Sequence, residues 1–575
     1  MFNQIAILVA ATMGVHQSMQ EAPPQARDLL SEPGALTPSL AAVLPPLSSP
    51  TARISPLHSP ALEVLRSVEL VRTIVDFQDG MYSDMVQFLR LKAPSLPSSD
   101  KHTEPYVLAD FEALDRVLAP WYAVHGTSRL GVLFETHRHM HHIVLLHSVF
   151  FGLVDVVWYL HRNGLLFMTY YPHIDLAAFN GMLRLLPFLH AVGCRGTTKA
   201  IDGAAQRGHL QVIQWLVANR MDGATELAMV GAAANNHLDV VEFLNENRRD
   251  GCTSAAMDLA AGRGHYRMVK WLHAHRTEGC TTHAMNDAAK NGHLDVVEWL
   301  HTTRTEGGTI KAMNQAAASG HLDIVEFLHE HRQEGCTTSA VDGAASNGHV
   351  DVVSWLLEHR TEGGTHRAMD GAACNGHLNM VQWLHDRGFE CTASAMDLAA
   401  THGHLDVVQW LHANRGEGCT KQAMDGAATN GFIMVVQFLH ANREEGCTTQ
   451  AMTGAARYGF VDVVRWLSSN RSEGCTTHAM NLAATYGHMD VVQYLHAHRK
   501  EGCTAEAVDG AVEHGHFDVV EWLLANRTEG CSGRAQFWAQ ENGWNRLARL
   551  LQRKSMPEWT SDECNSYRML LRYRP

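Results

Sequence analysis

The protein has 575 residues, more than one compact core usually holds, so the chain either divides into domains or extends as repeats. Hydrophobic residues make up 46%, which is typical of a globular chain rather than a disordered one. The formal net charge is −14 with both signs interleaved, and this excludes the basic stripe that a nucleic-acid surface needs.

Residues 1–19 contain a short apolar run, Ile5 to Gly14. The run is long enough for the core of a signal peptide, but no Lys or Arg precedes it and no cleavage site is distinct. Two glycosylation sequons, at Asn470 and Asn526, fall at one fixed place of a repeat, so chance repetition explains them. We expect a cytoplasmic protein without a membrane segment, and secretion is the alternative.

Residues 20–60 are rich in Pro, Ser and Ala, which predicts a disordered linker. Residues 61–125 show helix-like apolar spacing, as in "ALEVLRSVELVRTIVDF" and "DMVQFLRL". We expect a small helical region there. It has no phosphate loop, metal motif or catalytic triad, so we expect no enzyme, catalytic residue or cofactor.

From about residue 126 to residue 552 a repeat of 28 residues takes over, with single-residue slips near 181 and at 403. A glycine marks each unit, and Asn236 fills the one gap. About fifteen units follow from these markers: Gly152, Gly181, Gly208, Gly264, Gly292, Gly320, Gly348, Gly376, Gly403, Gly431, Gly459, Gly487, Gly515 and Gly543.

Each unit predicts two short helices joined at the marker glycine, which permits the positive φ of a tight turn. Apolar residues share one face of each helix, as Met452 and Ala455 do in the first and Val463 and Trp466 in the second. Helices this short are unstable alone, so each pair must stack on its neighbours. The predicted fold is an all-α solenoid of stacked units.

At these residues the sequence resembles the ankyrin repeat family. The resemblance rests on "NGHLDVVEWLH" at 291–301 and on the double alanine Ala288–Ala289, and it covers residues 126–552. The ankyrin unit usually has 33 residues, so the shorter unit here implies a short loop in place of the family's β-hairpin. The family implies a protein-interaction scaffold that holds a protein or peptide on its concave face.

We expect a monomer with no nucleic-acid or membrane partner. The basic segment "RLARLLQRK" at 546–554 is typical of a terminal cap, and residues 553–575 form a tail. Two alternatives stay open: an adaptor whose N-terminal region recruits a second component, and a secreted protein that acts outside its own cell.

Several residue types recur once per unit. Histidines follow the marker glycine, and stacked copies lie about 10 Å apart, too far to share a zinc ion, so we expect no metal site. Aspartates such as Asp425 recur in the first helix, where they could pair with histidines. Cysteines such as Cys447 are expected to be small buried residues, tryptophans such as Trp466 to be core, and Arg–Glu pairs to be an exposed ladder.

The positions that vary are the candidates for partner binding. The two residues before the marker glycine are mostly small or polar, but late units place Arg457, Tyr458, Tyr486 and His514 there, and Phe432 and Phe460 replace the usual histidine nearby. Aromatic and Arg side chains are typical interface anchors. We therefore predict a contact patch over residues 429–516. Unselected variation at an exposed place is the other interpretation.

Overall fold

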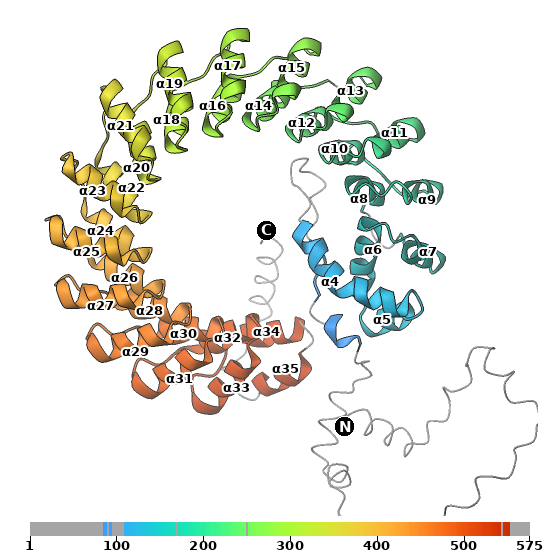
Figure 1. Cartoon of the computed structure of the whole chain (residues 1–575). Coiled ribbons are helices and arrows are strands. Elements are labelled where there is room, and N and C mark those ends of the chain that lie inside the picture. The colour runs from blue at the N-terminus through green and yellow to red at the C-terminus, as the bar shows by residue number, and fades with distance from the viewer. Residues whose placement is uncertain are drawn as a thin grey trace, which may run out of the picture. The chain divides into compact units, whose positions relative to one another are not determined.

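A computed structural model describes residues 84–88, 91–94, 108–167, 171–248, 251–541 and 544–552 (Figure 1). The regions expected at 1–19, 20–60 and 553–575 lie outside these residues, as do residues 61–83 of the expected helical region. The chain divides into two compact units with the boundary at Tyr170 and Tyr171. In the described residues every regular element is a helix, and none of these helices has the length and apolar character to cross a membrane.

Unit 1 is a small helical unit, and the first described residues of the chain, 84–88, pack into its core. Met85 and Phe88 are fully buried, and Asp84 accepts hydrogen bonds from Trp121 Nε1 at 3.1 Å and from Arg129 Nη2 at 2.9 Å. Its elements are η2 (Val86–Phe88), α4 (Leu108–His125), α5 (Leu130–Thr136), α6 (Met140–Phe150) and α7 (Val154–Arg162).

Unit 2 consists of helix pairs, and in Figure 1 the first helix of each pair lies on the inside of an arc. The first helices are α8 (His173–Phe179), α10 (Lys199–Gln206), α12 (Glu226–Ala234), α14 (Ser254–Gly262), α16 (Thr282–Lys290), α18 (Ile310–Ala318), α20 (Thr338–Ser346), α22 (His366–Cys374), α24 (Ala393–Thr401), α26 (Lys421–Thr429), α28 (Thr449–Arg457), α30 (Thr477–Thr485), α32 (Ala505–Glu513) and α34 (Gly533–Glu541).

The second helices form the outer row of the same arc (Figure 1). They are α9 (Leu186–Ala191), α11 (Leu210–Asn219), α13 (Leu238–Asn247), α15 (Tyr266–His275), α17 (Leu294–Thr303), α19 (Leu322–His331), α21 (Val350–His359), α23 (Leu378–Asp386), α25 (Leu405–Asn414), α27 (Ile433–Asn442), α29 (Val461–Asn470), α31 (Met489–His498), α33 (Phe517–Asn526) and α35 (Asn545–Gln552).

The ends of the first helices follow from their sequence. Thr281 is the N-cap of α16, and its hydroxyl accepts a hydrogen bond from the His283 N–H at 3.1 Å. At the other end Gly292 has a φ of +81°, and the His293 N–H returns to the Ala288 carbonyl at 3.0 Å. This is the Schellman arrangement that a left-handed glycine closes. The same turn recurs at Asn236, where φ is +62°.

The core lies between the two rows and between successive pairs. In α16 and α17 the fully buried side chains are small or aliphatic, such as Ala288, Val297 and Leu300. The inner helices pack closely: a Cβ added to Gly426 would lie 2.0 Å from the Thr401 hydroxyl of the preceding helix. Close packing of small residues along the inner row brings those helices nearer together than the outer row, and this produces the arc.

The predicted all-α solenoid of helix pairs is confirmed. The described residues of unit 2 form fourteen pairs, and α6 with α7 makes a fifteenth pair around Gly152, whose φ is +66°. The expected tryptophan core is wrong. Trp271 and Trp466 are only half-buried, and Trp466 stands edge-on against the His440 ring of the preceding repeat at 5.1 Å between centroids. Alanine, valine, leucine and methionine fill the core instead.

Candidate partner-binding surface

A carboxylate or amide in most of the first helices links that repeat to the next. Asp425 Oδ1 accepts the Thr448 N–H and Asp425 Oδ2 accepts the Thr448 hydroxyl, both at 2.7 Å. The Thr448 hydroxyl in turn accepts the Gln450 N–H, so the link fixes the N-cap of the next helix. The other pairs are Asp175–Thr197, Asp202–Thr225, Asp258–Thr281, Asn286–Thr309, Asn314–Thr337, Asp342–Thr365, Asp370–Thr392, Asp397–Thr420, Asn481–Thr504 and Asp509–Ser532.

These aspartates do not pair with histidines as the sequence suggested. Their partner is the threonine that starts the next repeat, because the chain returns to the inner row after the second helix. Burial raises the pKa of Asp175 to about 6 although two hydrogen bonds from Thr197 oppose the shift. Asn286 performs the same role without a charge, so the link depends on an acceptor oxygen rather than on an ion.

Two junctions of unit 2 lack this link. Val230 and Thr453 occupy the place of the acceptor, and the threonines that follow them, Thr253 and Thr476, make no side-chain N-cap hydrogen bond. The Thr453 hydroxyl instead donates to the Thr449 carbonyl of its own helix at 2.8 Å. The loss of the acceptor therefore also releases the N-cap of the following helix.

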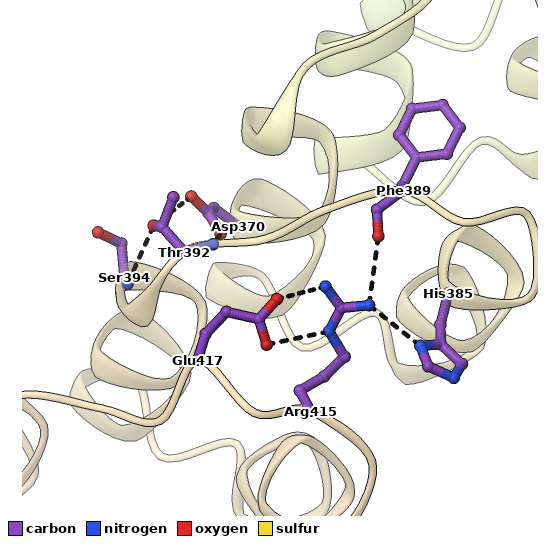
Figure 2. A network of polar contacts seen from close by, with 7 residues as sticks. All are labelled: Asp370, His385, Phe389, Thr392, Ser394, Arg415 and Glu417. Atoms are coloured by element: carbon purple, nitrogen blue, oxygen red, sulfur yellow. Dashed lines mark hydrogen bonds and ion pairs between the residues drawn. The ribbon is translucent and has the colours of Figure 1, made fainter.

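A second link joins the outer row. Figure 2 shows Arg415 held by Glu417 and reaching back to the preceding repeat, where Nη1 donates to His385 Nδ1 at 3.2 Å and to the Phe389 carbonyl at 3.3 Å. Equivalent Arg–Glu pairs recur from Arg276–Glu278 to Arg527–Glu529. The side chains are only about a quarter exposed, so the expected exposed ladder is more buried and better bonded than the sequence suggested.

Hydrogen bonds from these arginines lower the carboxylate pKa values. The Arg471 guanidinium, outweighing burial, holds the pKa of Glu473 at about 2, and the backbone N–H of Cys447 in the preceding repeat adds to the effect. A pair that also bonds the previous loop ties two repeats together. This is the reason for treating the pair as structural and not as part of a binding site.

The residues after the marker glycines form a column of stacked rings. A Cβ on Gly208 would lie 2.4 Å from His237 Nδ1, so glycine is needed there for space as well as for its φ. Burial is the main cause that lowers the pKa of His209 and His265. The ring also bonds the backbone at His265, whose Nε2 donates to the Ala234 carbonyl at 3.1 Å.

Phe432 and Phe460 belong to this column. Phe460 is the half-buried N-cap of α29, and a Cβ on Gly431 would lie 2.6 Å from its ring; Phe432 lies in the same way against Gly403. Both rings therefore serve first to pack one turn on the next. They border the predicted patch, because Phe460 follows Tyr458 by two residues.

Asparagine recurs at the ends of the first helices, as at Asn235, Asn291, Asn347, Asn375 and Asn430. Their amides donate to the carbonyl of the residue that ends the preceding first helix, as Asn291 does to Gly262 at 2.6 Å and Asn347 to Ala318 at 2.6 Å. Three successive repeats near the end of the array replace this amide with Tyr458, Tyr486 and His514. An inter-repeat hydrogen bond is exchanged there for exposed ring surface.

Arg457, Tyr458, Tyr486 and His514 come together as one cluster, which we call the Arg–Tyr patch. The Arg457 guanidinium lies 5.4 Å from the Tyr458 ring centroid and 5.3 Å from that of Tyr486, and its Nη2 donates to the Tyr486 hydroxyl at 3.0 Å. The Tyr486 and His514 rings follow at 5.9 Å. The patch is exposed: Tyr458 is 52% and Tyr486 40% accessible.

The cysteines that recur once per repeat are not part of an exposed binding surface. Cys447 and Cys475 are buried, as expected, and burial raises the pKa of both thiols to about 11. Within the described residues the cysteines are unbridged, and His, Cys, Asp and Glu form no group of three that could hold a metal ion.

Comparison with known families agrees with this geometry. A family model of three ankyrin repeats matches residues 231–311, 285–370, 313–395 and 452–536. Residues 231–395 and 452–536 are ankyrin repeats. No curated protein matches it. Ankyrin repeats in general bind other proteins and are typically not enzymes.

The most regular feature of these ankyrin repeats, the Asp–Thr link, was missed in the sequence although a signal is present. Wherever Asp or Asn occupies the middle of the first helix, a Thr or Ser follows after 22 or 23 residues. That spacing crosses a turn, a helix and a loop, so only the stacked fold shows that the two side chains meet.

Proposed function

We propose that the protein is an interaction scaffold that holds a protein or peptide against the inner row of unit 2, with the strongest contact at the Arg–Tyr patch. The observation that carries this proposal is the replacement of three successive inter-repeat amides by exposed Tyr458, Tyr486 and His514. Arg and Tyr dominate binding energy in protein interfaces because they combine large apolar area with polar groups.

The arrangement of Arg457 supports the same proposal. Two tyrosine rings and one hydrogen bond already fix its guanidinium before a partner arrives. A side chain ordered in advance loses less conformational entropy on binding, so its contacts contribute more to affinity. Its N–H groups that do not bond Tyr486 remain available to a carboxylate or a backbone carbonyl of the partner.

Crosslinking tests the proposal directly. A photo-reactive amino acid at Tyr458 is compared with one at His402, which is also an exposed C-cap, in α24. The full chain should crosslink a partner from 458 and not from 402. The triple change Arg457→Ala, Tyr458→Ala and Tyr486→Ala should weaken capture of that partner at least about tenfold, or ~1.4 kcal/mol.

A matched control keeps the result interpretable. Lys290→Ala changes the exposed last residue of α16, the place that Arg457 has in α28, and should leave capture unchanged. Unchanged capture by the triple variant, at an unchanged melting temperature, would reject the patch as the contact site. Capture lost equally in Lys290→Ala would replace it with a diffuse contact along the whole inner row.

A further inference from the structure

Unit 1 carries a groove that the scaffold function does not use. It has a volume of about 850 Å³ and lies between the C-terminal end of α4 and helix α7. Tyr122, Gly126 and Thr127 line one side, and Val154, Trp158 and Arg162 line the other. The lining combines aromatic and aliphatic surface with one guanidinium, that of Arg162, and one carboxylate, that of Asp155.

Trp158 is a large apolar residue at a position that faces solvent. It is 48% exposed, and the Arg162 guanidinium lies 4.4 Å from its ring centroid. In the second helices from α11 to α33 the same place holds Gln, Glu, Lys, Arg or Ser, as at Gln214 and Gln437. Val154, at the start of the same helix, is 40% exposed. An exposed apolar face of this kind indicates an interaction surface.

The path of the chain indicates what covers the groove. The described part of the chain begins at Asp84, whose carboxylate bonds Trp121 and Arg129 and lies 3.6 Å from His125 Nε2. Residues 122, 126 and 127 of the groove are within one helical turn of these partners. The described chain therefore begins beside the groove.

The residues that precede Asp84 contain a segment with matching chemistry. In residues 61–77, "ALEVLRSVELVRTIVDF", Val64, Val68, Val71 and Val75 recur at the spacing of one helical face. A helix of this length is marginal in water and needs an apolar surface to stabilise it. Both signs of charge have a complement: Glu69 can pair with Arg162, and Arg66 or Arg72 with Asp155. Residues 78–83 can span up to about 20 Å, enough for the helix to turn back onto unit 1.

We propose that residues 61–77 bind the groove of unit 1 as an amphipathic helix and cover Trp158. The N-terminal region then has a partner within its own chain. The groove is a second interaction surface, separate in sequence and in chemistry from the Arg–Tyr patch. A chain that covers its own exposed tryptophan also avoids offering that face to other proteins.

Hydrogen exchange of the full chain tests this proposal. Backbone amides of 61–77 should exchange roughly tenfold or more slowly than expected for an unfolded peptide, and Trp158→Glu should abolish that protection. Glu is the natural residue at the equivalent place in α17 and α19, so the helix itself tolerates it. Gln437→Glu, at the same place in α27, is the matched control and should leave the protection of 61–77 intact.

Two further measurements distinguish residues 61–77 from any other occupant of the groove. Val68→Glu with Val71→Glu should also abolish protection of 61–77 while unit 2 keeps its own exchange pattern. A photo-reactive residue at Trp158 should crosslink to 61–77 within one molecule. Amides of 61–77 that exchange as fast in the native chain as in Trp158→Glu would overturn the proposal. Crosslinks that join two molecules, or a different protein, would also overturn it and assign the groove to that occupant.

Discussion

Asp425 in α26 accepts two hydrogen bonds of 2.7 Å from Thr448, which lies at the start of α28 in the next repeat. The contact supplies an N-cap to one helix from a side chain of the previous one. Each helix of the inner row therefore begins in a position that its predecessor sets. Where the acceptor is missing, at Val230 and Thr453, the next inner helix begins without this bonded N-cap.

Restoring a missing link should stabilise the array. In Thr453→Asp the new carboxylate can accept the Thr476 N–H and hydroxyl, so we expect a gain of about 1 kcal/mol. Because repeat arrays unfold in parts, hydrogen exchange of α30 is the suitable measurement, and its amides should become more protected. Asp425→Ala should have the opposite effect on α28. Faster exchange of α30 in Thr453→Asp would contradict the role assigned to the link.

A marker glycine that lies against a ring of the next repeat should not tolerate a side chain. Gly431 has a φ of +81°, and an added Cβ would lie 2.6 Å from the Phe460 ring. Gly431→Ala should therefore cost roughly 1–3 kcal/mol, measured as a lower melting temperature. Gly416 has open space around it and no left-handed φ, so Gly416→Ala should change stability by about 0.5 kcal/mol or less. Equal effects of the two changes would count against this explanation.

The ring column should make stability fall in weak acid. Burial, with the neighbouring His349 and His404, lowers the pKa of His377 below its usual 6.5. As pH falls through 6.5 the unfolded chain takes up a proton before the folded chain does, so stability decreases. His377→Phe copies the native Phe432 and should reduce the loss of melting temperature between pH 7 and pH 5. The same loss of melting temperature in both proteins would show that His377 does not cause the acid sensitivity.

The contribution of the outer Arg–Glu pairs to stability should be lost at a lower pH than that of the histidines. The pKa of Glu473 is held at about 2, below its usual 4.5, so its contribution is complete above pH 4.5 and disappears towards pH 2. Glu473→Gln should cost roughly 1 kcal/mol at pH 7, a modest amount because the pair is partly solvated. Denaturant unfolding at several pH values should show the two proteins converge below pH 4.5. A difference that stays constant down to pH 2 would be the contrary result.

The fold could be predicted from the sequence because each unit repeats the same local signals. The glycine at a 28-residue step marks a left-handed turn, and residues such as Met452 and Val463 show which faces are buried. These signals act within one unit. The helix ends at Arg457 and Tyr458 were placed correctly for the same reason.

Contacts between units were harder to predict. The sequence placed Trp466 in the core because an indole is large and apolar, but the inner row is too close-packed for it, and it stands between repeats against His440. Phe432 and Phe460 appeared to be partner contacts and are also packing residues over the preceding turn. The meeting of Arg457 with Tyr486 was expected from the repeat register, since equivalent positions in adjacent units are neighbours.

The unit formed by α22 and α23 is one residue shorter than its neighbours, yet Asp370 still reaches Thr392 at 2.8 Å and Arg415 still reaches His385 (Figure 2). Helix α23 ends at Asp386, one residue earlier than the other outer helices nearby. Gly388, with a φ of +76°, then turns the chain back towards the inner row. Slippage during replication that trims a loop, or that adds or deletes a whole copy, would thus leave the surrounding copies intact. The number of repeats, and with it the length of the inner surface, can therefore change during evolution without a change of fold.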